Sequence, residues 1–206
     1  GFVPRRGIER YRLGVNFRPR PHRWGIRQMF FEQSYSLVTG ASGRWESYQV
    51  FLAPINWELE SGDRFEANVT PQGERLVEPF EVADGVILEP GSYHFRRFRL
   101  ETEFAARRRV SGQLTWRFGG FYSGSLHQLE AEAAWKPSAE VSLELNAEHD
   151  IGRLPEGNFA TSVIRARALF NFSTDLTLSS LIQYDTDSRN WGSNTRLRWS
   201  FSPLGD

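Results

Sequence analysis

Residues 128–135 read QLEAEAAW and residues 141–148 read VSLELNAE, and these two stretches indicate the fold most clearly. In both, every second residue is apolar, and most of the residues between them are Glu, Gln, Ser or Asn. Successive side chains of a β-strand point to opposite faces, so a two-residue period predicts a strand with one apolar and one polar face. Both stretches are therefore predicted strands, joined by the short connection 136–140.

The same period recurs along most of the chain. The alternation is regular from Tyr93 onward, where further segments are 113–122, 164–172, 176–185 and 194–201. Less regular segments before Tyr93 are 11–17, 27–37, 49–59 and 65–69. No stretch shows the 3.6-residue period of a helix. Residues 70–91 contain Pro and Gly without a sustained period and are predicted to form a long loop. The expected fold is all-β, an antiparallel up-and-down meander of about ten or eleven strands.

The composition excludes several classes of protein. The 206 residues include 25 basic and 25 acidic side chains, so there is no electrostatic reason to expect a nucleic-acid partner. There is no cysteine, so no metal or redox site can use thiols, and no cofactor is expected. No apolar run reaches the roughly 20 residues of a membrane helix. A strand of a membrane β-barrel, however, exposes only alternate residues to lipid and keeps an ordinary mean hydropathy.

Aromatic residues and connection lengths favour such a barrel over a soluble sheet. Aromatic side chains of the apolar face gather at strand ends, with Trp135, Phe170, Phe172, Trp199 and Phe201 at one end and Phe118, Tyr122 and Tyr184 at the other. Two aromatic belts are typical of a barrel that meets two lipid–water interfaces. Connections 105–111, 136–140 and 173–175 are expected to be short, and 70–91, 119–126, 150–158 and 185–192 long, as when only one rim faces the periplasm. The sequence therefore predicts part of a transmembrane β-barrel.

The polar face carries charges of both signs, which are predicted to face a hydrated lumen. These residues are Arg117, Glu130, Glu132, Glu144, Glu148, Arg165, Arg167, Arg196 and Arg198. The last four arginines are expected on two strands with one strand between them, so that all four share a face. Two interpretations are open, a salt-bridge ladder that fills the lumen or a constriction that selects solutes.

No catalytic or metal site is predicted. Glu148, His149 and Asp150 could form a general-base pair, but their predicted place before a loop indicates solvated rim residues. Asp185, Asp187 and Asn190 lack the Gly and the distal Glu of a calcium loop, which favours a polar hairpin turn.

Several short motifs resemble one bacterial family. They are SGDRFE at 61–66, PQGERL at 71–76, PFEV at 79–82, PGSYHFRRFR at 90–99, FGGFYSGSL at 118–126, LPEGNF at 154–159, QYDTD at 183–187 and NTRLRW at 194–199. In these motifs the chain resembles the C-terminal region of an uncharacterised outer-membrane family, in which a domain similar to carbohydrate-binding family 9 precedes a large β-barrel. The resemblance implies a membrane barrel in the bacterial outer membrane, with outer-membrane lipid as its partner and glycans reached only through the N-terminal domain.

The whole of 1–206 is thus expected to be one barrel segment of a longer protein, without that N-terminal domain and without two final strands. The expected function is a pore, an export conduit or a membrane platform for a glycan-binding domain. The alternatives are an outer-membrane enzyme that acts on lipid or glycan, and a soluble β-sandwich that binds sugar. A sandwich would bury the apolar face, and an enzyme would bring a nucleophile and a His or carboxylate pair together at one rim.

Overall fold

A computed structural model describes residues 7–200, and Phe201 of the predicted aromatic belt lies outside this range. The described chain consists of strands and turns: β1 (Glu9–Phe17), β2 (Ile26–Met29), β3 (Phe31–Thr39), β4 (Trp45–Leu59), β5 (Arg64–Leu76), β6 (Phe80–Ala83), β7 (Val86–Leu88), β8 (Gly91–Phe104), β9 (Val110–Phe121), β10 (Gly124–Trp135), β11 (Val141–Leu154), β12 (Gly157–Asn171), β13 (Leu176–Asp185) and β14 (Asn190–Trp199). The all-β prediction is confirmed. Residues 7–200 contain no helix long and apolar enough to cross a membrane.

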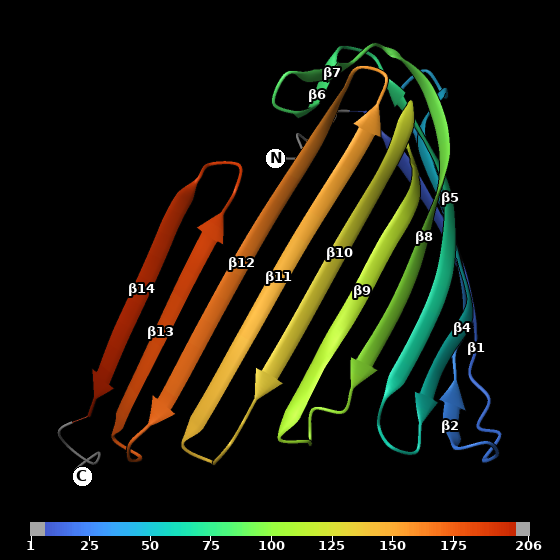
Figure 1. Cartoon of the computed structure of the whole chain (residues 1–206). Coiled ribbons are helices and arrows are strands. Elements are labelled where there is room, and N and C mark those ends of the chain that lie inside the picture. Colours follow the sequence, from blue (N-terminus) through green and yellow to red (C-terminus); the bar gives the residue numbers. More distant parts are fainter. Residues whose placement is uncertain (1–6, 201–206) are drawn as a thin grey trace, which may run out of the picture.

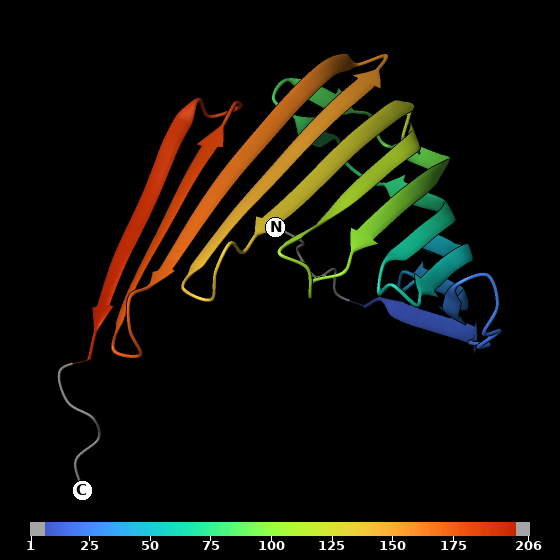
Figure 2. The ribbon, with the colours of Figure 1, turned by 60° about the horizontal axis from the view of Figure 1, so that its bottom comes forward.

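The strands form one large antiparallel sheet in meander order. Its order is β1-β3-β4-β5-β8-β9-β10-β11-β12-β13-β14, with β2 paired to β4 beside β3. Figures 1 and 2 show that the sheet curves strongly and stays open, so that the edges β1 and β14 do not meet. A second, two-stranded sheet of β6 and β7 folds over one end of the large sheet (Figure 1). The meander is confirmed, and the described strands do not close into a barrel.

The two faces of the sheet differ in polarity along its whole width. We call the face that bears Leu129, Leu145, Ile164 and Ile182 the apolar face, and the opposite one the polar face. Cross-strand pairs such as Leu129 with His149 and Ala147 with Ile164 carry each face from strand to strand without interruption. The alternation read from the sequence therefore predicted the faces of these strands correctly.

Burial is inverted relative to an ordinary soluble sheet. Polar residues of the polar face are buried, among them Glu66, Asn68 and Thr115, while large apolar residues such as Trp135 and Leu197 are 51% and 62% exposed. The lower exposure of the polar face identifies it as the concave side, where side chains crowd together. The exposed apolar residues extend from Tyr11 on one edge strand to Trp199 on the other.

The long loop predicted for 70–91 is wrong. Strand β5 continues to Leu76 and pairs with β8 over its full length, from Arg64 opposite Glu103 to Leu76 opposite Gly91. The remaining residues form the β6–β7 hairpin, which turns at Asp84 and Gly85, where Gly85 adopts a φ of 71°. Pro71 and Gly73 suggested a loop, but Pro71 lies where the pairing of β5 with β4 is interrupted, between Val69 and Gln72, and Gly73 leaves space for the ring of Tyr48.

The predicted alternation of short and long connections is also wrong. Only two residues join β9 to β10 and β11 to β12, and four join β13 to β14. The strands β8–β12 are 12–15 residues long and absorb the glycines that suggested loops. The ring of Phe159 occupies the position that a side chain at Gly152 would take. A glycine here makes room for an aromatic neighbour rather than a turn.

The predicted strand 27–37 is divided at Phe30 into β2 and β3, which pair with successive parts of β4. The pairing register of β4 with β5 shifts between Leu52 and Ile55. A β-bulge of this kind bends the strand and twists its neighbours, so β2 and β3 cannot run as one straight element.

Candidate functional site: the polar face

All nine charged residues predicted for the polar face lie on it. The register places Arg117 beside Gln128, Glu130 beside Glu148, and Glu144 beside Arg167, all on one side of the sheet. Arg165 and Arg167 of β12 and Arg196 and Arg198 of β14 flank β13 on the same side. The prediction that one strand separates the two arginine pairs is confirmed.

The most buried part of this face is centred on Glu66 of β5. Its carboxylate accepts hydrogen bonds from Asn68 Nδ2 at 2.7 Å and Asn56 Nδ2 at 3.2 Å. Arg64 and Arg99 approach it at 3.3 and 3.4 Å. Only 5% of the Glu66 side chain is exposed, so these partners replace water around the carboxylate.

A second carboxylate continues the network toward β9. Glu101 of β8 pairs with Arg99, and it accepts hydrogen bonds from Gln113 Nε2 at 2.8 Å and Thr115 Oγ1 at 3.0 Å. Thr115 is 1% exposed. Arg99 thus links Glu66 to Glu101, and its own Nε is buried without a hydrogen-bond partner. Charges of both signs are held here in fixed geometry by their neighbours.

The network then crosses to β11. Arg117 pairs with Glu130, and Arg97 donates to the backbone oxygen of Leu126 at 2.6 Å and to Gln128 at 2.9 Å. Gln128 Nε2 in turn donates to Asp150 at 3.0 Å. The second oxygen of Asp150 is buried and has no hydrogen-bond partner.

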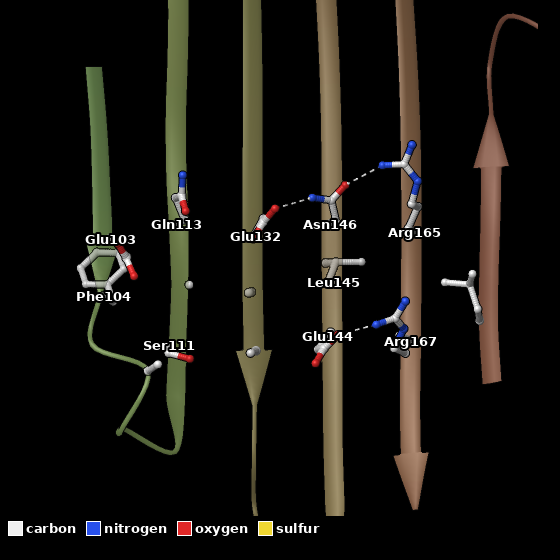
Figure 3. A pocket seen from close by; sticks show the side chains of 15 residues that line it. Glu103, Phe104, Ser111, Gln113, Glu132, Glu144, Leu145, Asn146, Arg165 and Arg167 are labelled. Carbon is white, nitrogen blue, oxygen red and sulfur yellow. Dashed lines mark hydrogen bonds and ion pairs between the residues drawn. The ribbon is translucent and has the colours of Figure 1, made fainter. Parts of the chain in front are cut away.

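Further along the sheet the polar face widens into an open trough of about 530 Å3. Figure 3 shows its charged lining, which comes from β8 to β12. Glu132 accepts from Asn146 at 3.1 Å, Asn146 accepts from Arg165 at 3.2 Å, and Arg167 lies 3.6 Å from Glu144 (Figure 3). The charged side chains of this trough are more exposed than Glu66, with 58% for Arg167 and 48% for Glu144 against 5% for Glu66.

The salt-bridge ladder, one of the two interpretations of the charged residues, is present in part. Arg117 and Arg167 pair with glutamates, whereas Arg165 binds the amides of Asn146 and Gln183. Arg196 and Arg198 face the hydroxyl-bearing Ser179 and Thr177, and neither has an ion pair with another described residue. The polar face therefore has a tightly paired half at β4–β9 and a loosely paired half at β12–β14.

The aromatic residues at strand ends agree with the prediction except for one. Trp135, Phe170, Phe172 and Trp199 lie at the end of the sheet that bears the turns 136–140 and 172–175, and Phe170 stacks on Phe172. At the other end Tyr184 packs on Trp191, with 4.6 Å between ring centroids. Phe118 lies on the apolar face too, slightly further from its strand end, stacked on Phe98 and Trp116.

Tyr122 is the exception, because it does not lie on the apolar face. It is the first residue of the β9–β10 turn, and its φ of 48° takes it out of the strand alternation. Its ring packs on Tyr93, Phe95 and Phe121. Its hydroxyl donates to Glu74 at 2.7 Å. Burial and the neighbouring Glu74 carboxylate raise the pKa of this phenol.

This tyrosine contributes to the main apolar cluster of the described chain. Leu76, Leu88 and Leu154 form its buried centre, and Tyr93, Phe121 and Phe159 are among the rings around it. The cluster lies on the polar side, at the end of the sheet where the β6–β7 hairpin folds over it (Figure 1). The cluster holds the β6–β7 hairpin across the concave face at this end of the sheet.

The candidate general-base pair is not assembled. His149 and Asp150 are consecutive residues within β11 rather than rim residues, and they point to opposite faces. His149 Nδ1 lies 2.6 Å from Ser162 Oγ on the apolar face. Asp185 and Asn190 close the β13–β14 turn as a polar hairpin, as predicted. Residues 7–200 hold no group of three His, Asp or Glu side chains that could bind a metal ion.

The residues of the polar face with the most extensive hydrogen bonds and ion pairs were not predicted from the sequence. Glu66, Arg97, Arg99 and Glu101 form its centre, and Asn56 and Thr115, each 1% exposed, are the most buried of their neighbours. A signal was present, since Arg97, Arg99, Glu101 and Glu103 share one parity in residues 97–103, RFRLETE. Since alternate residues of a strand share a face, this shared parity places all four side chains on one face.

Comparison with known proteins does not assign the chain to a family. No protein-family model, no curated protein and no solved structure matches it.

Proposed function

We propose that this sheet is part of the wall of a β-barrel in a bacterial outer membrane, with lipid on its apolar face and a hydrated passage on its polar face. The barrel acts as a pore or export conduit, or as the membrane platform of a glycan-binding domain. The resemblance to the outer-membrane family described above supports the last of these roles.

One observation carries the proposal: the exposed face of the sheet is the apolar one. A soluble sheet buries its apolar face against a second layer, whereas here Leu13, Leu114, Leu129, Leu145 and Leu197 are all exposed. Contiguous exposed apolar surface of this kind needs a partner, and a lipid bilayer supplies one along the whole sheet. Mixed charges on the concave side suit a water-filled lumen.

The edges of the sheet set a condition on this proposal. β1 and β14 each leave one side of their backbone unpaired in the described sheet. Unpaired backbone groups in hydrocarbon are costly, so both edges must pair, with each other or with further strands.

Two neighbouring residues of β11 provide the test. Leu143 lies on the apolar face, opposite Ala168, and Ser142 lies on the polar face, opposite Leu169. Arg in place of Leu143 would face lipid beside Trp135 of the aromatic belt, near one interface rather than at the midplane, and should lower the free energy of unfolding by about 1 kcal/mol. Arg in place of Ser142 would face the lumen and should cost far less. The measurement is reversible urea unfolding of the full chain folded into phosphatidylcholine vesicles.

Equal penalties for Leu143→Arg and Ser142→Arg would contradict the assignment of the two faces. Failure of the unmodified chain to become protected from protease in these vesicles would contradict insertion itself.

A further inference from the structure

Two arginines interrupt the apolar face. Strands β8–β14 lie entirely within the described part of the chain, and only Arg96 of β8 and Arg153 of β11 place an Asp, Glu, Lys or Arg side chain on that face. Both are exposed, and neither has an ion pair or a side-chain hydrogen bond with another described residue. A face that is otherwise free of formal charge over seven strands therefore carries two unpaired guanidinium groups.

The two arginines lie close to one row of paired residues that crosses β8, β9, β10 and β11. Arg153 pairs with Ser125 of β10, Ser125 pairs with Gly120 of β9, and Gly120 follows Gly119, which pairs with Arg97 of β8. Three strand spacings separate Arg96 from Arg153, or about 14 Å between their Cα atoms. Between them Gly120 has no side chain and Ser125 has a small one. No large side chain of β9 or β10 therefore stands in this row between the two arginines.

Aromatic and apolar side chains border this row on the side of the mid-sheet. Phe98 stacks on Phe118 at 5.4 Å between ring centroids, and Phe118 stacks on His127 at 6.3 Å. On the other side are the two-residue turns between β9 and β10 and between β11 and β12. The second of these turns begins at Pro155, two residues after Arg153. The arginines therefore mark the border between the apolar band and one rim.

An arginine at this border has a specific requirement in a membrane. A guanidinium in hydrocarbon is costly, and its flexible stem lets it extend toward the headgroup layer. There it meets phosphate oxygens, which guanidinium binds with charge-assisted, often bidentate hydrogen bonds. Since no carboxylate of β8–β14 lies on the apolar face, the complementary anion must come from outside these strands.

We infer that Arg96 and Arg153 together bind the phosphate of an anionic membrane lipid, whose headgroup rests on Gly120 and Ser125 while its acyl chains lie along the apolar band. This site rests on the proposed membrane function and names its lipid partner at one rim. At this rim the two arginines would therefore order the lipid headgroups of one leaflet.

The test compares lipids bound to the full chain by native mass spectrometry. The chain is folded into vesicles of equal parts phosphatidylglycerol and phosphatidylcholine, protease protection is scored, and bound lipid is counted after release from the vesicles. Arg96→Gln/Arg153→Gln should lower the ratio of bound phosphatidylglycerol to phosphatidylcholine about tenfold, which corresponds to about 1.4 kcal/mol. Arg196→Gln/Arg198→Gln removes two unpaired arginines from the polar face and should leave that ratio unchanged.

Each outcome decides a different point. A chain that is not protected in the vesicles overturns the barrel proposal and the lipid site together. Protection with the same ratio in Arg96→Gln/Arg153→Gln and the unmodified chain overturns the lipid site alone. Displacement of phosphatidylglycerol by an equal concentration of inorganic phosphate would show that the pair binds free phosphate, which also overturns a lipid site.

Discussion

At the residue scale, the most informative side chain is Glu66. Its carboxylate is almost fully buried, yet it has four polar partners on β4, β5 and β8. Removing one member of a buried ion pair leaves the others without compensation, which costs more than the pair contributes. Glu66 therefore holds Arg99 in position, and through Arg99 it also orders Glu101.

Glu66→Ala should lower the free energy of unfolding by about 3–5 kcal/mol, because Arg64, Arg99 and two asparagines lose a buried acceptor. Glu132→Ala is the matched control on the same face, since Glu132 is exposed and accepts only from Asn146. It should cost about 1 kcal/mol or less. Urea unfolding of the vesicle-folded chain measures both. Similar losses for the two variants would mean that burial adds nothing to the role of Glu66.

At the scale of elements, the turns at one end of the sheet are joined to one another. Asp63 in the β4–β5 turn accepts from the backbone N–H of Ala105 at 3.0 Å and from Arg108 at 2.8 Å, both in the β8–β9 turn. Arg107 donates to the backbone oxygen of Ser61 at 2.6 Å. The two turns close the adjacent strand pairs β4–β5 and β8–β9, in which β5 and β8 pair with each other. These contacts, here called the clasp, therefore join four strands at this end of the sheet, in addition to the backbone hydrogen bonds between those strands.

The clasp makes part of the stability depend on pH. The hydrogen bond from Arg108, with those from Ala105 and Ser61, lowers the pKa of Asp63 from 3.8 to about 2. A carboxyl group with a lowered pKa stabilises the fold above its ordinary pKa, and this contribution is lost as the pH falls through the folded value. Unfolding midpoints of the unmodified chain and Asp63→Asn should therefore differ most at about pH 5 and converge toward about pH 2.

Asp175→Asn serves as the control for this titration, since Asp175 is an exposed residue of the β12–β13 turn at the same end of the sheet. It should leave the unfolding midpoint close to that of the unmodified chain, because the Asp175 carboxylate has no hydrogen bond or ion pair with another described residue. A constant difference between Asp63→Asn and the unmodified chain over the whole range would exclude the clasp as its cause.

At the scale of the whole molecule, the connections divide between two ends. The turns after β4, β8, β10 and β12 lie at one end, and those after β9, β11 and β13 lie at the other with the β6–β7 hairpin (Figure 1). In the proposed membrane these ends are separated by a hydrocarbon core about 30 Å thick. Each end is therefore accessible from one side only.

Single cysteines test this sidedness, because the sequence contains no cysteine of its own. Ser138→Cys lies in the β10–β11 turn and Glu156→Cys in the β11–β12 turn, at opposite ends of β11. On intact cells an impermeant maleimide should label only one of these two variants, and it should reach the other only after permeabilisation. Labelling of both variants on intact cells would contradict a strand that spans the membrane.

The sequence by itself determined the strand class, the antiparallel order and, with the exception of Tyr122, the face on which the described residues of the predicted belts and charged set lie. These follow from the two-residue period, which is local, and they hold for all nine predicted charged residues of the polar face. Strand ends were predicted less well. A glycine that begins a turn and a glycine that makes room for a ring of a neighbouring strand cannot be told apart in the sequence. Gly73 and Gly152 are of the second kind.

Only the tertiary structure decided which charges meet. Glu66 and Arg99 are brought together by the pairing of β5 with β8, across the intervening β6–β7 hairpin, and this register is not a local property of either strand. The same holds for Arg96 and Arg153, which lie on one row only because of the registers of three successive strand pairs, β8–β9, β9–β10 and β10–β11. A period assigns a side chain to a face, whereas its partner depends on the relative positions of strands distant in the chain.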